Sequence, residues 1–83
     1  MTVEVKEASD GSTASYYELP VGARELKDLS NYKNMNGNIA EIFRACYRYG
    51  QVEHSPMERD INKILFYAEA ELERLRMHGV IKP

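Results

Sequence analysis

The sequence lacks several features that would point to a membrane, a nucleic acid or a secretory pathway. No apolar run approaches the ~20 residues that a membrane-spanning helix needs, and the start at residues 1–4 does not have the form of a signal peptide. Lys and Arg number 11 against 13 Asp and Glu, a net charge of -2, whereas a general nucleic-acid binder carries a basic excess. We therefore expect a cytoplasmic protein with neither a membrane nor a nucleic acid as its partner.

Motifs for catalysis and cofactor binding are also missing. His54 and His78 have no Cys or His at zinc-ligand spacing, no serine stands in a nucleophile elbow, and no glycine-rich phosphate loop is present. Glu69, Glu71 and Glu73 invite a magnesium site, but a solvated helix face explains them more simply. The sequence thus predicts no metal, no cofactor and no catalytic group, which argues against an enzyme.

The single cysteine, Cys46, lies among apolar positions of a predicted helix. With no second cysteine in the chain to pair with, it fits a reducing compartment. We expect a thiol packed against apolar neighbours rather than a nucleophile.

Composition divides the chain into a flexible segment, residues 1–15, and a helical domain, residues 16–83. Residues 2–6 alternate polar and apolar side chains as a strand would, so they either form a disordered tail, which we favour, or pair with another copy. The remaining ~65 residues are few for a self-sufficient core. Self-association is therefore expected.

Three helices follow from periodicity and end signals. The first is predicted over 21–33, with Pro20 in its first turn. The second covers 37–49 and ends at Gly50, whose missing Cβ suits a left-handed cap. The third begins at Ser55, which with Glu58 would form a capping box, has Pro56 as its first helical residue, and closes at Gly79.

Apolar side chains recur at helical spacing along the second and third helices. In the second they are Ile39, Ile42, Phe43 and Cys46, and in the third Met57, Ile61, Ile64, Leu65, Ala68, Leu72 and Leu75. The third helix is nearly twice as long as the second. The second helix can therefore cover only about half of the apolar stripe of the third, and another helix or a second subunit must cover the rest. We expect an all-α fold: a short N-terminal helix plus a long antiparallel helical hairpin, assembled as an oligomer.

Four cations stand in pairs one helical turn apart, on either side of the joint between these helices: Arg44, Arg48, Arg59 and Lys63. Like charges at this spacing repel each other, and a bound phosphate would relieve the repulsion. Tyr67 lies near enough to stack on a base. The alternative is neutralisation by neighbouring acids: Glu41, Glu53, Glu58 and Asp60.

Residues 39–75 resemble the SaV-like family of small bacteriophage proteins. The resemblance rests on Arg48-Tyr49-Gly50, which ends one helix, and on residues 59–67, which open the next. The same segment is similar to the C-terminal part of a T7-type phage nucleotide kinase. One departure is that Gly37-Asn38 lies a helical turn before the place where the family often has Gly-Asn.

The resemblance implies a phage accessory protein. We expect it to bind a nucleotide or another phosphorylated ligand at Arg44, Arg48, Arg59, Lys63 and Tyr67. The alternative is a protein-interaction module that binds and modulates a host protein and takes no small-molecule ligand. A nucleotide-transferring enzyme is a third hypothesis, weakened because the N-terminal region of the kinase has no counterpart here.

Overall fold

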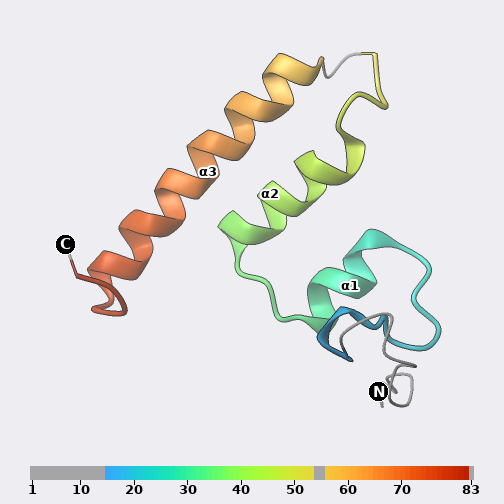
Figure 1. Cartoon of the computed structure of the whole chain (residues 1–83), viewed down its shortest axis with the longest axis horizontal. Helices are drawn as coiled ribbons and strands as arrows, with labels where there is room; N and C mark the ends of the chain where they lie inside the picture. The colour runs from blue at the N-terminus through green and yellow to red at the C-terminus, as the bar shows by residue number, and fades with distance from the viewer. Residues whose placement is uncertain (1–14, 54–55, 83) are drawn as a thin grey trace. The chain divides into compact units, whose positions relative to one another are not determined.

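The computed structural model describes residues 15–53 and 56–82. Its elements, in chain order, are the 3-10 helix η1 (Ser15–Tyr17) and the α-helices α1 (Leu26–Tyr32), α2 (Gly37–Arg48) and α3 (Met57–Met77) (Figure 1). These described residues form no β-strand, which confirms the predicted all-α class. The strand-like segment at 2–6 lies outside the described residues.

The chain divides into two compact units between Asn34 and Met35. Asn34 has a φ of 52°, a left-handed conformation that asparagine adopts more readily than most residues. The first unit contains α1, and the second contains α2 and α3.

The predicted start of the first helix, at residue 21, is wrong. The backbone after Pro20 makes a turn, in which Ala23 N–H donates to the Pro20 carbonyl at 3.3 Å and Gly22 takes a φ of 85°. A positive φ cannot continue an α-helix. The helix begins only at Leu26, where the Asp28 carboxylate accepts from the N–H groups of Arg24 and Glu25, each at 3.0 Å.

The second helix agrees with its predicted range. Asn36 is its N-cap, and the side-chain oxygen of Asn36 accepts from Ile39 N–H at 3.1 Å. Tyr49 is the C-cap, and Gly50 follows with a φ of 70°. Gly50 therefore has the left-handed role that the sequence predicted.

The third helix begins one residue later than predicted. Pro56 is the N-cap rather than the first helical residue, with an extended ψ of 157° and no side-chain cap. Ser55, the predicted capping residue, lies outside the described residues. At the other end, Gly79 has a φ of 71° and His78 N–H donates to the Arg74 carbonyl at 3.1 Å, so the helix closes where expected.

α2 packs against α3, and Figure 1 shows the two helices side by side. Polar side chains join them at both ends of α2. Asn38, near the start of α2, contacts Glu71 in the second half of α3. Arg48, the last residue of α2, contacts Asp60 in the first turn of α3. Polar pairs therefore join both ends of α2 to α3, and the fully buried Ala45 lies between these ends on α2.

Few side chains are buried. Within the described residues, Pro20, Ala45 and Asp60 are the buried ones. Cys46 is exposed, so the expectation of a packed thiol is wrong for the single chain. The physical reason is that Cys46 lies one residue, about 100° around the helix, from the fully buried Ala45, so its side chain points away from the buried side of α2. Among the described helices, none is long and apolar enough to cross a membrane.

Candidate functional site

Two of the four predicted cations meet at one carboxylate. Arg44 forms an ion pair with Glu41 one turn earlier on α2, and the Lys63 ammonium on α3 lies 3.8 Å from the other Glu41 oxygen. The Glu41 side chain is only 25% exposed, so the carboxylate is held between the helices. One acid thus serves two cations, which leaves this group with a net positive charge.

The third cation, Arg48, belongs to a separate and more buried pair. Its Nε donates to Oδ1 of Asp60 at 3.0 Å. Asp60 is fully buried, and Arg48 is 29% exposed. A carboxylate removed from water needs such a donor, so Arg48 is committed to stabilising Asp60.

Arg59 and Tyr67 stand apart from these pairs. Arg59 is exposed and makes no ion pair with any residue that the structure describes. Tyr67 is half-buried, and its ring packs edge-on against Phe66 with 5.1 Å between the ring centroids. The predicted ligand residues therefore divide among four environments.

This arrangement matches the alternative of internal neutralisation at two of the predicted acids, Glu41 and Asp60. The cations of α2 are each paired with a carboxylate, so relief of their repulsion requires no bound phosphate. The ligand hypothesis keeps Arg44, Arg59 and Lys63 as its accessible charges.

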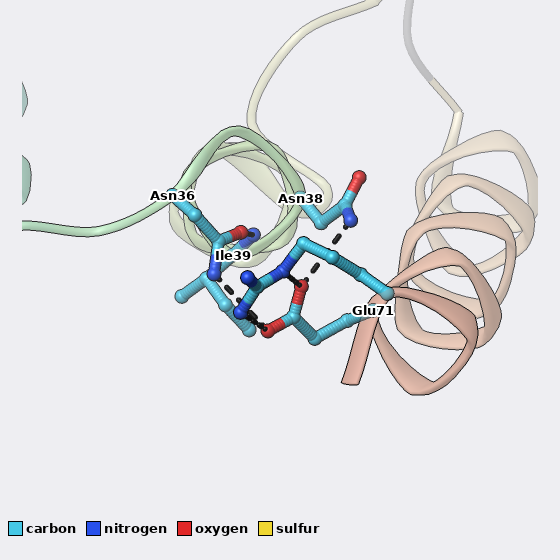
Figure 2. A network of polar contacts seen from close by, with 5 residues as sticks. Asn36, Asn38, Ile39 and Glu71 are labelled. Carbon is cyan, nitrogen blue, oxygen red and sulfur yellow. Dashed lines mark hydrogen bonds and ion pairs between the residues drawn. The ribbon is translucent and has the colours of Figure 1, made fainter. Parts of the chain in front are cut away.

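A second polar cluster centres on Glu71, as Figure 2 shows. Arg74 donates two hydrogen bonds to the carboxylate, from Nε to Oε1 at 2.8 Å and from Nη2 to Oε2 at 2.7 Å. From α2, Asn38 Nδ2 donates to Oε1 at 3.2 Å and Asn36 Nδ2 donates to Oε2 at 3.1 Å. Asn36 therefore caps its own helix with its oxygen and binds α3 with its nitrogen.

These donors shift the acidity of Glu71. The Arg74 hydrogen bonds lower the pKa of Glu71 from 4.5 to about 2, and the Asn38 and Asn36 amides act in the same direction against partial burial. The carboxylate lies beside the first turn of α2, where the positive end of the helix dipole also favours a negative charge. Glu71 is thus an ionised structural clamp between α2 and α3.

Sequence reasoning missed this clamp, because it grouped Glu71 with Glu69 and Glu73 as a solvated face. A signal was present in the asparagines around Gly37, whose short amides favour helix starts. The sequence pattern did not show that these asparagines would contact Glu71 on α3. Among the described residues, no three Cys, His, Asp or Glu side chains converge as a metal site would require.

The chain matches no protein-family model, no curated protein and no solved structure. The site must therefore be interpreted from its own residues.

Replacing Arg48 by Met should destabilise the protein strongly. The change leaves the buried Asp60 carboxylate without the Arg48 donor, and breaking a buried pair in this way costs about 3 kcal/mol or more. Arg44→Met is the matched control, because its ion pair is half exposed and should contribute less than about 1 kcal/mol. Urea unfolding at one fixed protein concentration measures both. Equal losses from the two variants would contradict the structural role of Arg48.

Acid should remove the stabilisation that Glu71 provides. Because the folded pKa lies below the unfolded one, the contribution is complete above pH 4.5 and is lost as the pH falls toward about 2. Glu71→Gln should flatten this part of the stability profile, whereas Glu73→Gln should leave it unchanged. A lowered pKa of Asp28 contributes to the same acid range in both variants, so their difference isolates Glu71. Thermal unfolding from pH 2 to 7 is the measurement, and identical profiles would refute the clamp.

Proposed function

We propose that the protein is a helical interaction module, in which α2 and α3 form an antiparallel hairpin that binds protein through one apolar face. The contacts at the two ends of α2 support the antiparallel course. The beginning of α2 contacts Glu71 late in α3, and its end contacts Asp60 at the beginning of α3.

Helical geometry gives the direction of the apolar stripes. At 100° per residue, the stripe of α3 lies about a quarter turn from the side that carries Asp60 and Glu71. On α2, the apolar stripe is also rotated from the side that carries Asn38 and Arg48. The rotation has the same sense as on α3, and its angle is somewhat larger. Since antiparallel helices reverse the apparent sense of rotation, both stripes emerge on the same side of the hairpin. We define the apolar face by these residues: Ile39, Ile42, Phe43, Cys46, Ile61, Leu65, Ala68 and Leu72.

Exposure of this face is the observation that carries the proposal. Ile61, Leu65 and Leu72 are 43%, 57% and 45% exposed, and Cys46 on α2 is exposed. The other residues of the face are half-buried: Ile39, Ile42, Phe43 and Ala68. Single exposed apolar residues are ordinary, but a contiguous apolar patch with polar edges is typical of an interaction site. A module of this kind acts by occupying or joining proteins and needs no catalytic group.

The resemblance to SaV-like phage proteins supplies a biological setting for such a module. Small phage proteins of this kind would act in the host cytoplasm, where a protein-binding face could modulate a host protein. Pairing of the acids Glu41 and Asp60 with nearby cations supports this function over phosphate binding.

Photo-crosslinking tests the face directly. With benzoylphenylalanine in place of Leu65, ultraviolet light should give a discrete protein adduct in expressing cells. The same group in place of Glu73, an exposed residue on the other side of α3, is the control and should give none. Failure to form an adduct at Leu65, or equal adducts at both positions, would overturn the proposal.

A second function, binding of a phosphorylated ligand, is favoured by one specific observation. Glu41 is shared by Arg44 and Lys63, and Arg59 is exposed a turn before Lys63. A phosphate could therefore join this group without displacing the Arg48 pair. Nucleotide binding through Arg44, Arg59 and Lys63 would then be a second role of the protein, in addition to protein binding.

A thermal-shift series separates this second function from the first. Millimolar ATP or inorganic phosphate should raise the unfolding temperature if the group binds anions, and Arg44→Met with Lys63→Met should abolish the rise. Arg76→Met, an exposed cation at the far end of α3, should keep it. No rise with either anion would eliminate the ligand function and leave the interaction module.

A further inference from the structure

The occupant of the apolar face can be inferred from the order of residues along α3. The stripe Ile61, Leu65, Ala68, Leu72 and Leu75 advances in alternating steps of four and three residues. This spacing is the seam of a two-helix coiled coil. The seam lies about a quarter turn around α3 from the side that contacts α2, which leaves Ile61, Leu65 and Leu72 exposed.

We propose that α3 packs antiparallel against α3 of a second copy of this chain, about a twofold axis that crosses the helix between Phe66 and Tyr67. This inference rests on the proposed function, because it names the protein that the apolar face binds. The axis sets Ile61 opposite Leu72 of the second copy, and Leu65 opposite Ala68. A large side chain thus meets a small one at the centre, as interdigitated packing requires.

The charges at the two ends of the seam are complementary about the same axis. Glu58 and Arg76 lie on the same side of α3, at the edge of the stripe and at opposite ends of the helix. Both are exposed, and neither forms an ion pair with the part of the chain that the structure describes. In the antiparallel pair Glu58 of each copy lies beside Arg76 of the other. A parallel pair would instead set Glu58 beside Glu58 and Arg76 beside Arg76.

Two independent features, side-chain size and end charge, are therefore self-complementary about one centre. A twofold axis requires this property, because each residue of the surface must fit a residue of the same surface. The scarcity of buried apolar side chains among the described residues gives the physical drive, since a chain this small gains much of its core from association. A second copy fits the face by both criteria.

Sedimentation equilibrium of the full chain, with charge-reversed variants, tests the arrangement. The wild type should be a dimer. Glu58→Arg and Arg76→Glu should each weaken the dimer by roughly tenfold, because the symmetry repeats every altered pair twice. The double variant Glu58→Arg/Arg76→Glu should recover most of the affinity. Glu73→Arg is the matched control and should leave the affinity unchanged.

Circular dichroism of each variant checks that α3 stays helical, since both reversals also oppose the helix dipole. Recovery in the double variant cannot come from the dipole, because that variant carries both unfavourable charges. A dimer in which the double variant stays as weak as the singles would refute the antiparallel arrangement.

The crosslinking result separates this inference from the function on which it rests. An adduct at Leu65 with twice the mass of the chain supports both. A monomeric chain whose Leu65 position captures a different protein would overturn the second copy and keep the interaction module. A monomeric chain with no adduct would overturn both.

Discussion

Two carboxylates on α3, Asp60 and Glu71, determine how α2 lies against it, and the rest of the second unit depends on that contact. Asp60 holds Arg48 at one end of α2, and Glu71 holds Asn36 and Asn38 at the other. Buried or half-buried carboxylates need donors, so these contacts hold both ends of α2 to α3. Part of the apolar stripes stays exposed outside this contact: Cys46 on α2 and Ile61, Leu65 and Leu72 on α3.

The same two carboxylates also change the interpretation of the basic residues. Arg48 is a structural partner of Asp60, and Arg74 completes the ligation of Glu71. The group around Glu41 keeps a net positive charge, and Arg59 is exposed. What resembled one basic corner is therefore a structural pair, a shared carboxylate and an exposed arginine.

Much of the fold could be predicted from the sequence, because its signals are local. Gly50 and Gly79 ended their helices as expected, since a residue without a Cβ takes a positive φ at little cost. The periodic stripes gave α2 and α3 nearly to the residue. The first helix was predicted too long because Gly22 was not recognised as a turn residue, and Pro56 was placed one position too far inside α3. Both errors concern end signals that several backbone arrangements can satisfy.

The candidate site could be predicted only in part. Sequence reasoning found the cations and named Glu41 and Asp60 among the acids that might neutralise them, but it could not tell a ligand-free pair from an anion site. It also assigned Cys46 to a packed interior and Glu71 to a solvated face. Both assignments assumed that the most apolar side of each helix would face the other helix. By itself the sequence determined the helices, their ends and their stripes, because these follow from contacts within a few residues. Only the tertiary structure decided which sides meet, because that choice depends on whether a carboxylate finds its donors across a gap of 12 to 35 residues.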